Sequence, residues 1–239
     1  MFILTNCRQL VVILHNSTVL PITAADRVLV EIRQAIVEGT IAAGSKISEP
    51  ELAKRFTLSR APLREALARL ERCHLIERIP NAGARVVKLS IQGLLSLYQL
   101  RETLEAMACR LAAENMTDAE ISEVRQLLDQ HLSTQRVREG ESYYQEAGDL
   151  DFHYRVIIGS KNPYLINILC DELYHLVRMY RVQLGMNGPR VSRAFDEHKA
   201  IITAIANRDG ELAELLMRRH IAASRRNIEQ RLKQQEELL

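Results

Sequence analysis

The chain has few of the residues that interrupt helices or fill β-sandwiches. Its 239 residues include no tryptophan, only seven tyrosines and four phenylalanines, and only ten glycines and six prolines. Leu, Ala, Arg and Glu are common instead, and all four are compatible with helices. Because a strand-rich sandwich needs frequent turns and many aromatic or β-branched residues, this composition predicts a mainly α protein.

The chain also lacks closely spaced cysteines and a long apolar segment. Its four cysteines are far apart and form no Cys-x-x-Cys pair: Cys7, Cys73, Cys109 and Cys170. We expect them to be reduced, buried thiols of a cytoplasmic protein. The longest apolar run in residues 1–20, LVVIL, is too short to cross a bilayer, and its flanks do not match a secretory signal. We therefore expect no membrane partner, and treat residues 1–20 as an arm of unknown role.

Positive charge is concentrated in one part of the chain. Residues 21–88 hold twelve Lys and Arg against eight Asp and Glu, whereas residues 89–239 hold 19 against 22. The overall formal charge is only +2. A small basic segment joined to a slightly acidic one suits a nucleic-acid-binding module followed by a partner domain.

The basic segment has the element order of a winged helix-turn-helix. Apolar residues recur at helical spacing over 26–37, and a second helix is expected to begin at Ser48, with Glu51 completing a capping box and Pro50 in its first turn. A third helix follows, capped by Ser59. Residues 76–89, IERIPNAGARVVKL, then read as two strands joined by a turn. We assign this DNA-binding domain to residues 21–88.

The outward face of the third helix carries the candidate DNA-reading residues. Leu63, Leu67 and Leu70 form its inward stripe, so that Arg60 and Arg64, four residues apart, share the opposite face. Two guanidinium groups there, flanked by the small residues Ser59 and Ala61, can reach guanine edges in the major groove. The alternative is that both arginines are solvated surface charges. The neighbouring helix and wing favour DNA binding.

From residue 91 to residue 236 the pattern is helical almost throughout. An apolar stripe runs along the first helix, a Thr117–Glu120 capping box opens the next, and further helices are expected around 142–158, 163–184, 190–207 and 210–235. Short loops between long helices predict an antiparallel all-α bundle. Residues 88–91 form the expected joint between the two domains.

Polar residues interrupt the apolar stripes of this bundle. His198 and His220 lie in line with the apolar residues of their helices, and Asp149 and His153 lie one turn apart on a third. A buried histidine must find a partner, so each one alone fits a core residue bonded to a backbone carbonyl. Together, three imidazoles and a carboxylate on three helices favour a shared divalent metal such as Zn²⁺, Ni²⁺ or Mn²⁺.

These motifs together resemble those of the GntR-superfamily transcription regulators of the FadR type, which carry a C-terminal FCD domain. The resemblance rests on LSRAPLREALARL, PNAG, LRETLE, DLDFHYRVIIGSKNPYL and the later histidines. It implies a winged helix that binds a palindromic double-stranded DNA operator as a homodimer, and a helical domain that senses a small organic acid. It also implies metal-ligand roles for four side chains: Asp149, His153, His198 and His220.

The same resemblance assigns roles to further residues. Arg60 and Arg64 would read bases, with Ser59 and the wing residue Gly83 near the backbone and the minor groove. For a carboxylate effector, Arg101 on the first helix of the bundle is our candidate clamp. The alternative for Arg101 is a surface salt bridge with Glu105. Asn162 and Arg178 are weaker effector candidates.

Three functions remain to be compared. The favoured one is a ligand-responsive transcriptional regulator, most simply a repressor and not an enzyme. A metal-dependent hydrolase-like enzyme is the second, because a metal held by three histidines and a carboxylate could activate water. A helical assembly protein, in which the histidines are ordinary bonded core residues and no ligand is sensed, is the third.

Overall fold

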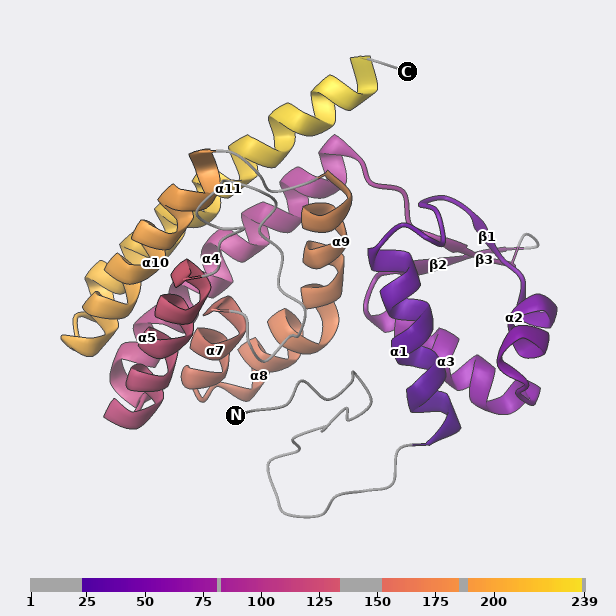
Figure 1. Cartoon of the computed structure of the whole chain (residues 1–239), viewed down its shortest axis with the longest axis horizontal. Helices are drawn as coiled ribbons and strands as arrows, with labels where there is room; N and C mark the ends of the chain where they lie inside the picture. Colours follow the sequence, from indigo (N-terminus) through magenta and orange to yellow (C-terminus); the bar gives the residue numbers. More distant parts are fainter. Residues whose placement is uncertain (1–22, 81–82, 134–151, 185–188, 238–239) are drawn as a thin grey trace.

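The computed structural model describes residues 23–80, 83–133, 152–184 and 189–237. A winged helix-turn-helix occupies one side of the molecule and an all-α bundle the other (Figure 1). The predicted fold class, mainly α with these two parts in this order, is therefore confirmed. The arm predicted for residues 1–20 lies outside the described residues.

Three helices form the body of the winged helix: α1 (Ala24–Val37), α2 (Glu49–Phe56) and α3 (Arg60–Arg72). Their apolar faces meet in a core where Ile32, Leu67 and Leu70 have no exposed surface. A capping box begins α1, in which the side chains of Thr23 and Asp26 each accept a backbone hydrogen bond from the other residue. This cap was not anticipated from the sequence.

The expected caps of α2 and α3 are wrong in detail. Ser48 and Ser59 do occupy the N-cap positions, and Pro50 lies in the first turn of α2, but neither serine side chain makes a capping hydrogen bond. The Ser48–Glu51 capping box is therefore not formed. The Thr117–Glu120 box at the start of α5 (Asp118–Ser133) is confirmed, because each residue bonds the other's backbone N–H.

The predicted wing is a three-stranded antiparallel sheet in the order β1–β3–β2. Strands β2 (Ile76–Ile79) and β3 (Gly83–Val86) form the hairpin expected from the sequence, with Ile76 opposite Val86. The additional strand β1 (Lys46–Ile47) pairs with β3. Two residues carry no recognisable alternation, so the pattern could not reveal this strand.

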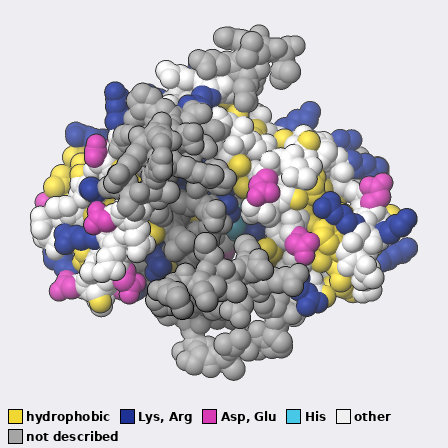
Figure 2. Space-filling model, viewed as in Figure 1, with side chains coloured by type: hydrophobic (Ala, Val, Ile, Leu, Met, Phe, Trp, Pro, Cys, Tyr) yellow, Lys and Arg dark blue, Asp and Glu magenta, His cyan; other side chains and the backbone are white. Residues whose placement is uncertain are grey.

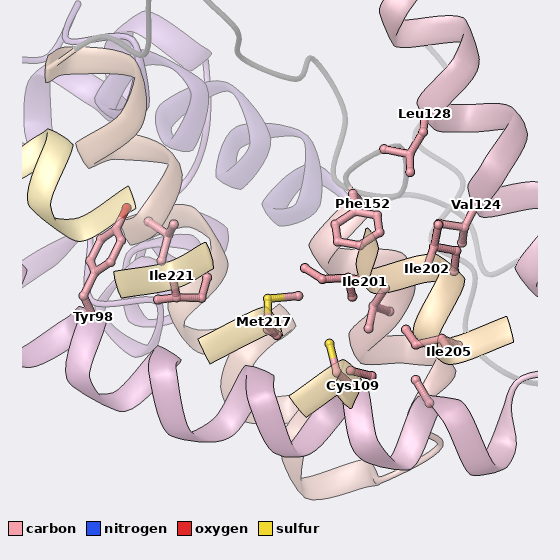
Figure 3. Close-up of a cluster of buried hydrophobic side chains, with 14 of the residues drawn as sticks. Tyr98, Cys109, Val124, Leu128, Phe152, Ile201, Ile202, Ile205, Met217 and Ile221 are labelled. Carbon is pink, nitrogen blue, oxygen red and sulfur yellow. The ribbon is translucent and has the colours of Figure 1, made fainter. Parts of the chain in front are cut away.

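The bundle is built around α4 (Ile91–Asn115), which packs along its length against α11 (Gly210–Glu237) (Figure 1). Helices α7 (Phe152–Gly159) and α10 (Pro189–Ala206) cover further faces of α4, and α5 packs against α7 and α10. Figure 3 shows their apolar side chains meeting in one core, with Phe152, Ile202 and Met217 among the residues. None of the described helices combines the length and apolarity needed to cross a membrane.

The segment 163–184, expected as one helix, contains a change of helix type. It begins as α8 (Pro163–Ile166), widens into the π-helix η2 (Asn167–Leu173) and continues as α9 (Tyr174–Leu184). A π-helix shifts the faces of the residues that follow it relative to a regular α-helix. The inward positions of α9 therefore cannot be read from the period of the preceding residues.

Candidate functional site

The outer face of α3 carries the two arginines expected to read DNA. Ser59, Arg60, Ala61 and Arg64 are all exposed. Arg64 keeps 65% of its side chain exposed while its Nε lies 3.5 Å from Oε2 of Glu49. An exposed ion pair of this length is weak, so it leaves the guanidinium available to another partner. Figure 2 shows Lys and Arg side chains along the outer edge of the winged-helix side.

Gly83 begins the second strand of the wing with a backbone φ of +83°. Only glycine adopts this left-handed conformation without strain, so Gly83 shapes the turn between the strands. Residues 81 and 82 lie outside the described residues. The DNA-contact roles of Ser59, Arg60, Ala61, Arg64 and Gly83 stay predictions.

Three histidines from three helices meet inside the bundle. His153 lies in the first turn of α7, His198 on α10 and His220 on α11, and all three are buried. The Nε2 atom of His220 lies 3.2 Å from Nε2 of His153 and 3.3 Å from Nε2 of His198. Phe152 stacks on the His198 ring with centroids 4.1 Å apart and so restricts its orientation.

Two carboxylates hydrogen-bond the Nδ1 atoms of two of the histidines. Nδ1 of His153 lies 2.7 Å from Oε2 of Glu105, and Nδ1 of His220 lies 2.6 Å from Oε2 of Glu197. An ionised carboxylate only accepts hydrogen bonds, so it favours the imidazole tautomer with the proton on Nδ1. In that tautomer the Nε2 lone pair faces the other histidines. These partners are carboxylates, whereas backbone carbonyls were expected for ordinary core histidines.

Two of the three separations between the Nε2 atoms match the spacing of ligands to one cation, and all three ligand atoms lie within 4.8 Å of one another. Nitrogens bound at about 2.0–2.1 Å to one zinc lie about 3.0–3.4 Å apart for bond angles of about 90–110°. The separations of 3.2 and 3.3 Å fall within this range. The Nε2 lone pairs of His153 and His220, directed at each other, repel unless a cation or a proton lies between them. The donor set therefore fits a metal ion, and the identity of the ion is left open.

Next to the histidines, α4 carries a buried ion pair. The Nε of Arg101 lies 2.6 Å from Oε1 of Glu105, and the two side chains are only 5% and 3% exposed. Burial alone would raise the pKa of Glu105, but the positive charge of Arg101 and the hydrogen bonds from Arg101 and His153 lower it to about 2. The Arg101–Glu105 pair considered from the sequence exists, although in the core and not on the surface.

A small cavity opens beside these groups. Together with its opening to solvent it encloses about 280 Å³ of empty space. Besides the three histidines, it is lined by five residues: Tyr98, Arg101, Arg181, Ala194 and Ser224. Arg181, only 9% exposed, comes from α9, and Ser224 lies one turn after His220 on α11. Cationic and hydroxyl groups around a cavity can bind an anion with several oxygens.

The sequence predicted only some of the residues of this site. It found the three histidines and Arg101, but missed Arg181, Ser224 and the supporting carboxylates Glu105 and Glu197. A buried arginine on α9 carries no periodic signal because the π-helix precedes it. The signal for Ser224 was its spacing of four residues from His220, which places both on one helix face.

Three other candidates lie elsewhere. Asp149 falls outside the described residues. Asn162 is the N-cap of α8, where its side-chain oxygen accepts hydrogen bonds from the backbone of Tyr164 and Leu165. Arg178 lies on α9, where its charge acts on Arg33 of α1 and on His175. Neither Asn162 nor Arg178 is among the residues that line the cavity, and their effector roles stay untested.

Helix α9 also contacts the winged helix. Met179 has no exposed surface and belongs to the apolar core of the winged helix. The Gln183 side chain donates hydrogen bonds to the carbonyl oxygens of Ile36 (2.8 Å) and Val37 (3.4 Å) at the end of α1. Arg181 of the same helix lines the cavity of the bundle. Helix α9 therefore contacts the winged helix with one face and the cavity with another (Figure 1).

Comparisons with known protein families agree with this architecture. Residues 24–86 match the family described as bacterial regulatory proteins of the gntR family, and residues 96–223 match the FCD domain. The second match alone covers more than half of the chain. The chain therefore belongs to the GntR family of transcriptional regulators, in the FadR-type group that carries an FCD domain, as the sequence motifs indicated.

Relatives and solved structures extend the comparison. The chain is 31% identical to the Nta operon transcriptional regulator of Aminobacter aminovorans, over 74% of this chain and 81% of the relative. It is 29% identical to a probable D-xylose utilization operon transcriptional repressor of Paenarthrobacter nicotinovorans, over 84% and 87%. The structure of McbR/YncC from E. coli shares the fold, with a TM-score of 0.69 at 20% identity, over 88% of this chain and 99% of that one.

These relatives are transcriptional regulators and not enzymes. The prediction of a regulator is therefore confirmed, and the alternative of a metal-dependent hydrolase is rejected.

Proposed function

We propose that this protein is a ligand-responsive repressor that binds a palindromic DNA operator as a homodimer, in the cytoplasm, and senses a small carboxylate at a metal ion in its helical domain. The observation that carries the sensing role is the convergence of three buried histidines beside a polar cavity. Two relatives support the repressor role: the probable D-xylose utilization operon repressor described above and the gluconate operon transcriptional repressor of Bacillus licheniformis, which is 26% identical.

DNA reading is assigned to the exposed face of α3 and to the wing. Arg60 and Arg64 would contact guanine edges, while Ser59 and Ala61 permit close approach of the helix to the groove. Gly83 would place the wing backbone beside the minor groove. All five positions lie on the surface of the winged helix, clear of its apolar core.

The metal would be held by His153, His198 and His220, with Asp149 as the fourth protein ligand. Nitrogen and oxygen donors of this kind suit Zn²⁺, Ni²⁺ or Mn²⁺. When bound, such an ion supplies a positive centre for a carboxylate. Glu105 and Glu197 orient two of the imidazoles through their Nδ1 atoms.

The effector would occupy the cavity next to the histidines. Arg181 and Arg101 both line it, and guanidinium groups bind carboxylates with two parallel hydrogen bonds. Because the Nε of Arg101 is engaged by Glu105, its terminal nitrogens would make the contact. The cavity has to widen to admit even a small acid, because its enclosed space is about that of one water molecule.

The homodimer interface is assigned to the outer faces of α4 and α11. Large apolar side chains stay exposed there, with Leu100 at 43%, Met107 at 48% and Leu215 at 43%. The two faces are adjacent because Arg110 of α4 pairs with Glu211 and Glu214 of α11. A second copy would cover these side chains, and two winged helices are needed to read two half-sites.

The signal would pass through α9. Binding of an anion to Arg181 biases the position of α9, and Met179 and Gln183 transmit that shift to the winged helix. Residues 88–91, which join the two domains, are hydrogen-bonded to the same helix. The Tyr180 hydroxyl donates to the backbone oxygen of Ser90 (3.2 Å) and accepts from its N–H (3.3 Å). A ligand can shift an equilibrium only through such differential contacts.

The DNA-binding part is tested by selecting a site from random double-stranded DNA with the wild-type protein and measuring gel retardation. Arg60→Ala with Arg64→Ala is expected to weaken specific binding at least about thirtyfold, because each base-reading arginine contributes about 1–3 kcal/mol. Arg72→Ala, an exposed arginine at the other end of α3, is the matched control. Unchanged retention by the double variant contradicts the assignment.

The dimer is tested by light scattering after size-exclusion chromatography. Met107→Glu should give a monomer, whereas Tyr164→Glu, at a tyrosine that is 79% exposed on α8, should leave the mass unchanged. A dimer that survives Met107→Glu together with Leu215→Glu would place the interface elsewhere.

A further inference from the structure

Tyr98 is a buried polar residue at the cavity for which the contacts described above give no role. It lies on α4 one turn before Arg101, has no exposed surface and lines the cavity. Figure 3 shows its side chain extending from α4 toward Ile221 of α11, at one end of the apolar core. Its hydroxyl oxygen is buried, and the hydroxyl proton has no acceptor among the residues that the structure describes.

Burying a hydroxyl group in this way destabilises the folded protein. A buried hydroxyl without a partner loses its hydrogen bonds to water and gains none in the protein. A phenylalanine of the same shape would fill the same space without this cost. The hydroxyl is therefore explained best by a partner that enters the cavity.

The surroundings of the hydroxyl define what that partner can be. Burial raises the pKa of Tyr98, while the positive charges of Arg101 and Arg181 and a hydrogen bond from Arg101 act in the opposite direction. The guanidinium carbon of Arg101 lies 4.7 Å from the centre of the Tyr98 ring. Guanidinium groups only donate hydrogen bonds, so neither arginine can accept the hydroxyl proton. That proton needs an oxygen or nitrogen acceptor supplied by the ligand.

We infer that the Tyr98 hydroxyl is a specificity determinant that hydrogen-bonds an oxygen substituent of the effector next to its carboxylate, so that the site prefers hydroxy acids to the corresponding deoxy acids. This inference rests on the proposed sensing function. The carboxylate goes to the cationic groups, and the second oxygen goes to Tyr98. An acid without that oxygen leaves the buried hydroxyl unpaired, which is how a polar site rejects an analogue.

The test compares three pairs of acids on the zinc-loaded full-length protein by titration calorimetry: glycolate with acetate, lactate with propionate, and malate with succinate. For at least one pair, the wild type should bind the hydroxy acid about tenfold more tightly. Tyr98→Phe should bring the two dissociation constants of that pair to within about twofold, mainly by weakening the hydroxy acid.

Tyr180→Phe is the matched control. The Tyr180 hydroxyl already bonds Ser90, and Tyr180 does not line the cavity. This variant should lower the melting temperature and leave the discrimination between acids unchanged. Tyr98→Phe should change the melting temperature of the ligand-free protein by at most a degree or two, because the hydroxyl that it removes donates no hydrogen bond to a described residue there.

The outcomes separate the inference from the function on which it rests. If acids of a pair bind with a ratio that Tyr98→Phe leaves unchanged, or if Tyr98→Phe lowers the melting temperature by several degrees, the role of Tyr98 is wrong and the carboxylate sensor stands. If none of the six acids binds the zinc-loaded wild type, both the small-acid sensor and the role of Tyr98 are overturned.

Discussion

The winged helix keeps its charged side chains on the surface, whereas the helical bundle buries several of its own. In the winged helix the core is wholly apolar, and the arginines of α3 point outward. In the bundle, charged groups turn inward around a cavity. Among the described residues, every buried polar or charged side chain belongs to the bundle: Arg101, Glu105, His153, Ser160, Arg181, His198, His220 and Ser224.

In the proposed function, this difference would separate a domain that acts through its surface from one that acts through its interior. An apolar core is the simplest way to hold a surface in shape, and DNA is read entirely from outside. Buried charges contribute little to stability compared with apolar residues of the same size. Their concentration around one cavity therefore indicates a ligand site and not a device for stability.

The largest effect is expected from breaking the buried ion pair of the bundle. Arg101→Met leaves the Glu105 carboxylate buried beside His153 and should lower the free energy of unfolding by about 3–5 kcal/mol. Urea unfolding of the ligand-free protein, followed by circular dichroism, measures this. Arg110→Met breaks only exposed pairs with Glu211 and Glu214 and should cost less than about 1 kcal/mol. If both variants lowered the free energy of unfolding equally, buried and exposed ion pairs would not differ in the way described here.

A cavity in the winged-helix core should affect DNA binding but not the metal. Leu67 has no exposed surface, and Leu67→Ala should destabilise the winged helix by about 2–5 kcal/mol. Gel retardation should fall steeply near the melting temperature of this domain, while zinc content per chain stays that of the wild type. Glu65→Ala, an exposed position on the same helix, is the control. A parallel loss of zinc would show that the two cores do not act separately.

The link between the two regions is tested at Gln183. Gln183→Ala removes hydrogen bonds to the end of α1 and should cost about 1 kcal/mol. Hydrogen exchange in the last turn of α1 should become faster, and the change in DNA affinity between zinc-loaded and zinc-stripped protein should shrink. Gln34→Ala, exposed on α1, should leave that change as in the wild type. An undiminished zinc response in Gln183→Ala argues against transmission through this side chain.

The smallest effect concerns a partly exposed charge of the winged helix. Hydrogen bonds from Arg69 and Thr23 lower the pKa of Asp26 from 3.8 to about 2. The stabilisation is complete above pH 3.8 and is lost as the pH falls through about 2. Asp26→Asn should cost about 1 kcal/mol at pH 7, after discounting for exposure, and this cost should disappear below about pH 2. A pH-independent difference would mean that the charge of Asp26 is not its cause.

Much of the site could be predicted because helical periodicity survives in a buried bundle. His198 and His220 stand on apolar stripes, so their burial followed from the spacing alone. The alternative role considered for Arg101 placed its pair with Glu105 on the surface, because an amphipathic helix has one apolar face. Helix α4 is instead covered by several helices at once, which buries a wider sector of it.

Other features depend on information that periodicity does not contain. Arg181 follows the π-helix η2, which rotates α9 away from the expected register. Strand β1 is too short for any alternation to show. The supporting role of Glu197 required the tertiary arrangement of α10 and α11, because it and His220 are 23 residues apart. Pairings of this kind follow from packing and not from local pattern.

The most direct test of the account is a zinc titration of chelator-treated full-length protein, with an elemental analysis of the bound metal. Wild-type protein is predicted to bind about one ion per chain with a dissociation constant below about 1 μM, while His198→Ala and His220→Ala lose this binding and keep their fold. Failure of the wild type to bind Zn²⁺, Ni²⁺ or Mn²⁺ at micromolar concentrations would contradict the proposal that the inward-facing histidines form a metal-containing sensor.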